Sequence, residues 1–153
     1  MSDENEIVLI DDDEADVELA LHALRENKLV NHIEVLRDGE EALIFLFGPD
    51  RDARWASGRT PKLILLDLKL PKVDGIEVLR RIKNDPVTKF IPVVILTSSK
   101  EERDLVSGYN LGVNSYIQKP VDFDQFRAIV SQVGLYWLVI NQQAPVGTEA
   151  VIA

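Results

Sequence analysis

Short apolar runs alternate with amphipathic stretches along this chain of 153 residues, and this alternation restricts its possible folds most strongly. Five of the runs have strand-like composition: IVLI, HIEVL, KLILLDL, IPVVIL and SYIQ. Between the first two runs, Val17, Ala20, Leu21 and Leu24 recur at helical spacing. Uniformly apolar strands that alternate with helices are typical of a parallel sheet covered on both faces. We therefore predict an α/β fold in which a five-stranded parallel sheet is doubly wound with five helices.

The predicted helices follow the strands, and they leave one long loop. Residues 6–140 are expected to form one domain, whereas residues 141–153 have no clear period and are expected to be poorly ordered. The segment from Gly48 to Pro61 is a loop by composition, and its role stays open. The helices are expected at Glu14 to Asn27, after an N-cap at Asp38, around Ile76 to Ile82, at Glu101 to Leu111, and along an apolar stripe from Phe126 to Ile140.

Composition and charge exclude several classes of protein. The chain has no cysteine and therefore neither disulfides nor thiolate metal sites. It has no apolar run near the roughly 20 residues that span a bilayer, and its acidic N-terminus does not resemble a signal peptide. The net charge is −9, and no basic cluster suited to phosphates is present. We expect a cytoplasmic protein that binds neither nucleic acid nor membrane.

Polar residues stand at the ends of the predicted strands. The first strand ends at Asp11 and Asp12, the third at Asp67, the fourth at Thr97 and the fifth at Lys119. In a parallel sheet these ends meet at one edge, where ligands bind. Carboxylates that lie together repel each other, and a hard divalent cation removes that penalty. The strand ends therefore predict an Mg²⁺ site, although an acidic block after a strand can also be a solvated helix N-terminus, the role expected for Asp13.

The same residues suit phosphoryl transfer. A carboxylate can act as a nucleophile toward a phosphoryl group and form an acyl phosphate. Such a transfer needs positioning and charge neutralisation more than covalent help. Lys119 and Mg²⁺ could neutralise the phosphoryl oxygens, and the Thr97 hydroxyl could donate a hydrogen bond to one of them.

Four segments carry a resemblance to a known family. IVLIDDDEAD, LILLDLKLPKVDG, PVVILTSS and SYIQKP look like the four motifs of two-component response regulator receiver domains, which have the flavodoxin-like CheY fold. The motifs occur in the family's order and at its spacing, and the match covers nearly the whole chain. The resemblance implies that Asp67 is the phosphoacceptor. It also implies that Asp12 binds Mg²⁺ directly, Asp11 mainly through water, and Lys69 through its backbone carbonyl.

The resemblance also assigns a switch. Thr97 would be the switch hydroxyl, Tyr116 the aromatic side chain that swings inward on activation, and Lys119 the partner of the phosphoryl group. Lys69 stands where the family more often has a small polar or acidic residue. Its charge is expected to change the lifetime of the acyl phosphate, in a direction that stays open.

One branch of the family is closer to this chain, namely the small single-domain regulators that partner bacterial phytochromes. The resemblance rests on the long loop around Trp55 and on the segments SYIQKPVDFDQF and GLYWLVI. It implies a stand-alone regulator that receives its phosphoryl group from a sensor histidine kinase, of the phytochrome type in that branch. Leu135 and Val139 fall off the core stripe of the last helix. Apolar residues outside the core stripe indicate a partner surface. Receivers commonly pair through the face of the fourth helix, the fifth strand and the fifth helix, so the resemblance implies a homodimer through that face.

Three other functions compete with this interpretation. A hydrolase of the haloacid dehalogenase type needs an aspartate where this chain has Lys69. A flavodoxin-like cofactor module needs a phosphate-binding loop after the first strand, where this chain has aspartates. A pseudo-receiver, which acts without phosphorylation, typically lacks one of the site residues, all of which are present here. This last function is kept as the alternative.

Overall fold

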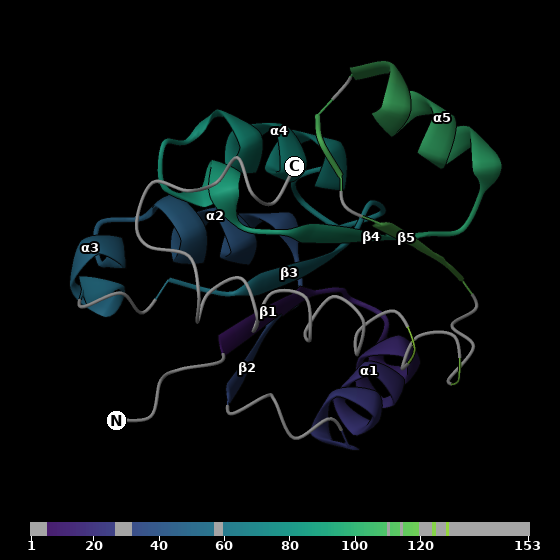
Figure 1. The fold of residues 1–153 in the computed structure, drawn as a ribbon, viewed down its shortest axis with the longest axis horizontal. Coiled ribbons are helices and arrows are strands. Elements are labelled where there is room, and N and C mark those ends of the chain that lie inside the picture. Colours follow the sequence, from purple (N-terminus) through teal and green to yellow (C-terminus); the bar gives the residue numbers. More distant parts are fainter. Residues whose placement is uncertain are drawn as a thin grey trace.

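The computed structural model describes residues 6–26, 32–56, 60–109, 111–113, 115–119, 124 and 128. Five parallel strands form one sheet in the order β2-β1-β3-β4-β5, which confirms the predicted architecture (Figure 1). The strands are β1 (Glu6–Ile10), β2 (His32–Leu36), β3 (Leu63–Asp67), β4 (Val93–Thr97) and β5 (Ser115–Gln118).

The helices cover both faces of the sheet. Helix α1 lies on one face, and α2, α4 and α5 lie on the other (Figure 1). Of the last predicted helix only Ala128 is described, and it is helical; the tail of residues 141–153 lies outside the described residues. The described helices are α1 (Glu14–Glu26), α2 (Gly39–Phe47), α3 (Arg51–Arg54), α4 (Gly75–Asn84) and α5 (Lys100–Tyr109), with a 3₁₀ turn at Thr88–Phe90.

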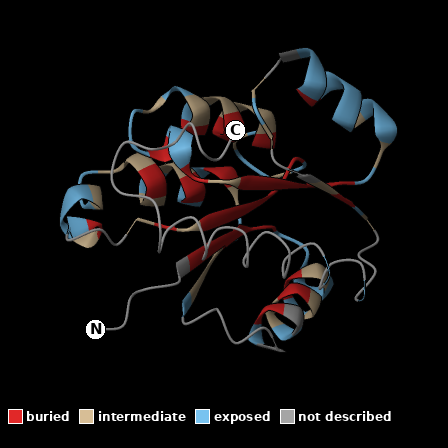
Figure 2. Ribbon diagram, in the orientation of Figure 1, coloured by how far each residue is buried: buried red, intermediate tan, exposed pale blue. Residues whose placement is uncertain are grey.

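The sheet separates two apolar layers. Along β1, Ile7 and Leu9 face the layer of α1, whereas Val8 and Ile10 face the layer of α2 and α4. This alternation follows from the period of two residues in a strand. Every residue of β3 and β4 is buried, and these two strands are drawn as buried in the centre of Figure 2. A buried Leu or Ile side chain contributes about 1.5–3 kcal/mol, so these strands fix the frame that holds the strand ends.

The segment from Gly48 to Pro61 differs from its prediction as a loop, because it contains the one-turn helix α3 and a buried tryptophan. Trp55 is 6% exposed and packs edge-on against Phe45, with ring centroids 6.3 Å apart. Arg51 lies over the Trp55 ring and pairs with Asp85 at 3.0 Å. A single helical turn is too short to show an apolar period in the sequence. Tertiary contacts therefore anchor this segment.

Local hydrogen bonds set the helix starts beside the strand ends. Asp13 accepts a bond from the Asp16 amide at 3.1 Å, which confirms its predicted role as a cap. Asp38 accepts from the Glu41 amide at 2.8 Å, as predicted. Gly75, at the start of α4, lies so close to β3 that a Cβ there would meet the Asp67 carbonyl oxygen at 2.5 Å. No helix in the described ranges is long and apolar enough to cross a membrane.

Candidate functional site

The predicted acidic residues meet at the carboxyl edge of the sheet. Asp11 and Asp12 follow β1 and Asp67 ends β3, and one carboxylate oxygen from each lies within 4.8 Å of the others. Asp11 is fully buried and Asp67 is 3% exposed, whereas Asp12 is exposed. The pairing of β1 with β3 places these strand ends side by side. The three carboxylates therefore form one cluster with a buried inner part and an open outer side.

The Lys119 ammonium closes the inner side of this cluster. Its Nζ lies 2.9 Å from Asp67 Oδ2 and 3.4 Å from Asp11 Oδ1. It also lies 2.9 Å from Asp16 Oδ2, on the first turn of α1. Asp16 was not predicted to be part of the site. One lysine thus joins three carboxylates that come from different elements of the fold.

Burial and like charges raise the proton affinity of Asp11. Burial is the main cause that raises the pKa of the Asp11 carboxyl to about 7, with a further contribution from the charge of Asp67. The Asp13 amide and the Lys119 charge act in the opposite direction. Burial also lowers the pKa of Lys119, but its bonds to Asp67 and Asp16 outweigh this effect and raise the pKa above its ordinary value. The site therefore carries a stable ammonium beside a carboxylate that is costly to ionise.

This donor set fits a divalent cation. Asp11 Oδ2 is buried and has no hydrogen-bond partner among the described residues. An unpartnered buried carboxylate oxygen costs free energy, and a cation that binds it removes that cost. Asp12 and Asp67 each offer a carboxylate oxygen that could complete such a site. Oxygen-only ligands with an open side suit hard divalent ions that keep part of their water shell.

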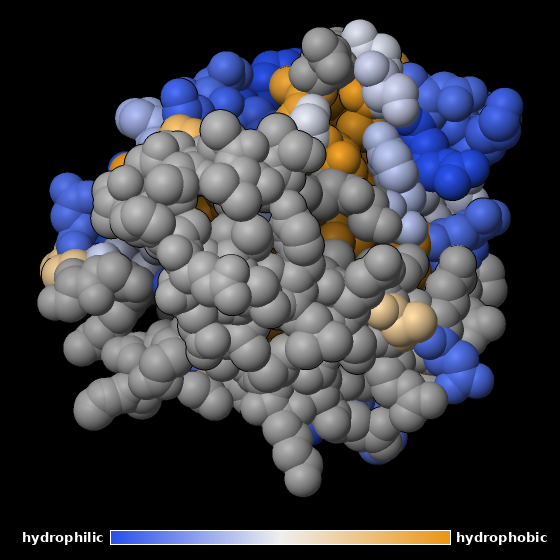
Figure 3. Space-filling model, viewed as in Figure 1, coloured by the Kyte–Doolittle hydropathy of each residue, from blue (hydrophilic) through white to orange (hydrophobic). Residues whose placement is uncertain are grey.

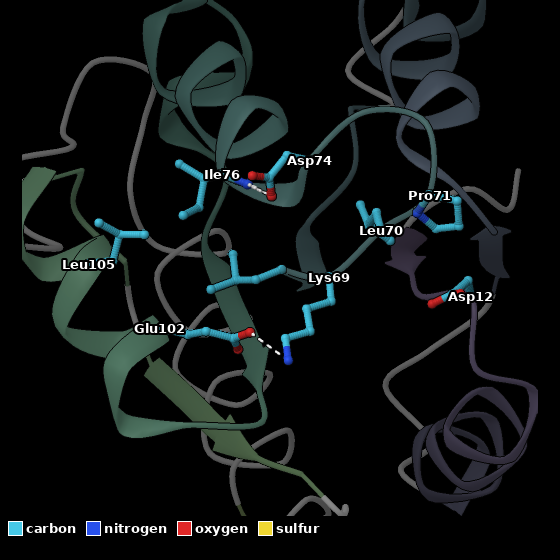
Figure 4. Close-up of a pocket in the computed structure, with 9 residues that line it drawn as sticks. Asp12, Lys69, Leu70, Pro71, Asp74, Ile76, Glu102 and Leu105 are labelled. Atoms are coloured by element: carbon cyan, nitrogen blue, oxygen red, sulfur yellow. Dashed lines mark hydrogen bonds and ion pairs between the residues drawn. The ribbon is translucent and has the colours of Figure 1, made fainter.

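Lys69 lies at the mouth of the site. Its amide donates to Asp67 Oδ1 at 3.1 Å, which fixes the second oxygen of that carboxylate. Its side chain is largely exposed and reaches toward α5, where Nζ lies 3.6 Å from Glu102 Oε2 (Figure 4). An open hollow of about 730 Å³ is lined by Asp12, Asp67, Lys69, Ser98 and Lys119, together with the first residues of α1. Asp67 is thus reached through this hollow.

Thr97 ends β4, next to the strand of Asp67, as predicted. Its Oγ1 donates to Glu102 Oε1 at 2.7 Å and lies 3.0 Å from the Ser99 carbonyl oxygen. Glu102 was not predicted to be part of the site. Burial raises the pKa of the Glu102 carboxyl, but the bonds from Thr97 and Ser98 and the Lys69 charge outweigh it and hold the pKa below its ordinary range. The Glu102 carboxylate, which accepts the hydrogen bond from the Thr97 hydroxyl, is therefore ionised.

Tyr116 lies on β5, half-buried against α5. Its hydroxyl is 3.4 Å from Ser107 Oγ, and the Arg103 guanidinium lies 5.8 Å from its ring centre. The β4–β5 register pairs Tyr116 with Ile95, two residues before Thr97. Tyr116 thus connects the strand next to the site with the outer helix α5.

A second hollow, of about 510 Å³, lies between the loop after β3 and helix α5 (Figure 4). Lys69 and Glu102 point toward each other in this hollow, and Leu105 and Ile76 are apolar residues of its lining. In Figure 3, hydrophobic atoms are visible beside the hydrophilic outer face of α5. The site therefore continues from the acidic cluster into a partly apolar cleft.

Two sequence signals could have identified the residues that sequence reasoning missed. Ser99 and Glu102 have the S-x-x-E spacing of a helix capping box, which places Glu102 near the end of β4. Asp13 and Asp16 have the spacing of an N-cap and the third residue of a helix, which places Asp16 on the first turn after the end of β1. Neither signal by itself distinguishes a site residue from an ordinary helix start.

Comparison with known proteins agrees with this geometry. The response regulator receiver domain family matches residues 7–131. The response regulator Rcp1 of Synechocystis sp. is 39% identical over 142 residues, which are 90% of this chain and 95% of Rcp1. A solved Mn²⁺-bound form of Rcp1 has a TM-score of 0.70 and covers 88% of this chain and 95% of that chain.

Two further solved structures are similar over most of their length. The bacteriophytochrome response regulator AtBRR is 46% identical, with a TM-score of 0.70, and covers 87% of this chain and 94% of its own. The phosphorylated cyanobacterial phytochrome response regulator RcpA is 41% identical, with a TM-score of 0.70, over 88% of this chain and 94% of its own. From the family match, the level of identity and the shared fold, we conclude that this chain belongs to the response regulator receiver domain family.

Proposed function

We propose that this chain is a stand-alone response regulator that accepts a phosphoryl group on Asp67 from a sensor histidine kinase. One observation carries the proposal. The Lys119 ammonium lies 2.9 Å from Asp67, beside a carboxylate cluster in which the buried Asp11 Oδ2 has no partner among the described residues. A cation on one side and an ammonium on the other would place positive charge on both sides of the acceptor, which is what phosphoryl transfer needs.

The transfer can be written from the residues of the site. An Asp67 carboxylate oxygen attacks the phosphorus of the kinase phosphohistidine, the new P–O bond forms, and the P–N bond breaks with its electron pair left on the imidazole. The Lys69 amide and Lys119 hold the carboxylate in place. Mg²⁺, bound by Asp11, Asp12, Asp67 and the Lys69 backbone carbonyl, would supply positive charge to the phosphoryl oxygens. The product is an acyl phosphate, which receiver domains of this kind are expected to hydrolyse themselves.

Thr97 and Tyr116 are proposed as the switch. A phosphoryl group on Asp67 would attract the Thr97 hydroxyl, and the space that this side chain leaves would allow Tyr116 to turn inward. Both side chains contact α5, through Glu102 and Ser107 respectively. Phosphorylation would therefore shift an existing equilibrium between two arrangements of the α5 surface.

The proposed donor is a kinase of the phytochrome type. The supporting observation is that AtBRR and RcpA, whose names connect them to phytochromes, are 46% and 41% identical to this chain. We place the exchange in the cytoplasm, which the absence of cysteine and hence of disulfides suits.

We further propose that two copies pair through α5, β5 and the last helix. In the described part of that face, Leu105 on α5 is 50% exposed. Leu135 and Val139, on which the prediction of the dimer rests, lie outside the described residues. Sedimentation of the protein and of Leu105→Lys, with and without phosphorylation, would test this pairing. An unchanged dimer in the variant would exclude Leu105 from the interface.

The pseudo-receiver alternative gains no support from this site. The acceptor, the cluster of carboxylates and Lys119 all lie within contact distance, as a phosphorylated receiver requires. A protein that acts without phosphorylation has no need to keep these charges together at the cost of their burial.

Intact mass spectrometry after incubation with acetyl phosphate tests the proposed function. The protein is compared with Asp67→Asn, each with Mg²⁺ and with chelator. Gain of one phosphoryl group that requires both Asp67 and Mg²⁺ is expected. A phosphoryl group that remains in Asp67→Asn would show that another residue is the acceptor. If no group is gained even with a phosphorylated histidine kinase as donor, the proposed function is wrong.

A further inference from the structure

The Glu102 carboxylate accepts hydrogen bonds from donors at the mouth of the site. Its Oε1 accepts from Thr97 Oγ1 at 2.7 Å and from the Ser98 amide at 3.1 Å. Its Oε2 lies 3.6 Å from Lys69 Nζ (Figure 4). A single carboxylate thus takes a hydroxyl, a backbone amide and an ammonium, a set of donors that also suits a phosphoryl group.

These donors lie next to the acceptor carboxylate. Ser98 and Lys69 line the same hollow as Asp67. Thr97 directly follows Leu96, which pairs with Asp67 across the β3–β4 ladder. A phosphoryl group on Asp67 would extend into the hollow that these residues border. It would therefore meet the donors that now face Glu102.

We propose that Glu102 is a positioning residue that competes with the phosphoryl group for the Thr97 hydroxyl and the Ser98 amide. The proposal rests on the proposed function and adds a means of its regulation. In the unphosphorylated protein, Glu102 holds these donors turned toward α5. Phosphorylation of Asp67 must draw them away from Glu102, and the release of Glu102 then frees the first turn of α5 to move.

The competition follows from the number of protons available. A threonine hydroxyl has one proton and the Ser98 amide has one. Neither can be donated fully to two anions at the same time. Hydrogen bonds to an ionised acceptor are stronger than those between neutral groups, so breaking the bonds to Glu102 costs free energy and opposes the activated arrangement. The bonds to Glu102 would therefore set the free energy that the bonds to the phosphoryl group must supply before the protein switches.

The same bonds also have a structural role, which the experiment must separate. Ser99 Oγ accepts the Glu102 amide at 3.1 Å, and the Glu102 side chain accepts the Ser98 amide in return. This is close to a capping box at the start of α5. Glutamine is accepted at that position of a capping box, so Glu102→Gln keeps the cap and removes only the charge. Glu102→Ala removes both.

The experiment measures the affinity of the full chain for beryllium fluoride, which mimics a phosphoryl group on a carboxylate, in the presence of Mg²⁺. Glu102→Gln and Glu102→Ala are compared with the parent protein and with Glu101→Gln, which removes the same charge from an exposed neighbour. Each change is also made in a Thr97→Ala background. Thermal unfolding of every variant reports the structural role.

Competition predicts tighter binding when Glu102 is removed. Loss of a charged acceptor from two donors should raise the affinity about tenfold in Glu102→Ala and about threefold in Glu102→Gln. Glu101→Gln should stay within about twofold. In the Thr97→Ala background the gain from Glu102→Ala should fall to about threefold or less, because the hydroxyl is no longer released. A purely structural role would lower the melting temperature without raising the affinity.

Two outcomes would overturn the inference and leave the proposed function standing. One is an affinity that is unchanged or weaker in both Glu102 variants. The other is an equal gain in the Thr97→Ala background, which would indicate a simple charge effect. If the parent protein shows no binding that depends on Asp67, with Asp67→Asn as the reference, the proposed function fails and the inference falls with it.

Discussion

Replacement of Asp11 by asparagine should stabilise the metal-free protein, and the gain should grow with pH. Asp11 is fully buried, and its Oδ2 has no partner among the described residues. Asparagine has nearly the same volume and keeps an oxygen for the Asp13 amide, which now donates to Asp11 Oδ1 at 3.0 Å. Lys119 keeps its bonds to Asp67 and Asp16. The change therefore removes a buried charge without emptying the site.

The size and sign of the effect follow from the pKa of Asp11. Burial raises this pKa from 3.8 to about 7, so between these values the unfolded chain has released a proton that the folded protein retains. Stability then falls as pH rises from about 4 to about 7 and levels off above it. Each pH unit in this range is worth about 1.4 kcal/mol. The advantage of Asp11→Asn should therefore increase by about 3 kcal/mol between pH 5 and pH 8.

Urea unfolding in the presence of chelator, at pH 5, 6, 7 and 8, measures this increase. Asp12→Asn is the control, because it removes a charge from the same cluster at an exposed position. Its effect should stay below about 0.5 kcal/mol at every pH. Two results would refute the idea that a buried Asp11 charge destabilises the protein. One is a gain in unfolding free energy by Asp11→Asn that is equal at pH 5 and pH 8. The other is a variant that is less stable than its parent at pH 8.

Other changes test the surroundings of the site. Mg²⁺ should bind about tenfold more weakly at pH 6 than at pH 8 by calorimetry, because Asp11 with a pKa of about 7 must lose its proton; equal affinities would contradict this. Lys119→Met leaves Asp67 and the neighbouring carboxylates without the ammonium that pairs with them, and should lower the free energy of unfolding in urea at pH 7.5 by about 3 kcal/mol. An unchanged midpoint would show that these ion pairs do not contribute to stability. Gly75→Ala should lower the free energy of unfolding by about 2 kcal/mol and slow phosphorylation, because its Cβ would meet the Asp67 carbonyl oxygen at 2.5 Å. Gly108→Ala is the control and should be neutral or stabilising, because open space surrounds Gly108 in its helix. Equal melting temperatures for the two variants would argue against the contact at Gly75. Trp55→Ala should cost about 3–5 kcal/mol in the same unfolding assay, and a loss below about 1 kcal/mol would mean that the ring is not part of the core.

The strand ends were predictable because parallel strands impose their own geometry. Once β1, β3, β4 and β5 are recognised as buried parallel strands, the residues that follow them must meet at one edge of the sheet. Asp11, Asp67 and Lys119 were predicted to lie together for this reason, and the structure shows their contacts. The helix caps at Asp13 and Asp38 were predictable for a similar reason, because a cap depends only on residues a few positions apart.

The contacts of Asp16 and Glu102 were not predictable in the same way. Each depends on the direction of a side chain from a helix start, and a change of rotamer would place its carboxylate in solvent. The helix α3 and the burial of Trp55 were also missed. A four-residue helix has no stability of its own, and Trp55 is buried against Phe45 of α2, while Arg51 over its ring is itself paired with Asp85.

The sequence by itself determined the class of fold, the edge of the sheet at which the site lies, and the chemical nature of its carboxylates, hydroxyl and ammonium. These follow from local periodicity and from the rule that parallel strands end together. Only the tertiary structure decided that Asp11 is buried with its Oδ2 unpartnered among the described residues, that Lys119 also contacts Asp16, and that Glu102 accepts the Thr97 hydroxyl proton. Burial and hydrogen-bond partners depend on how distant segments pack, and no short stretch of sequence contains that information.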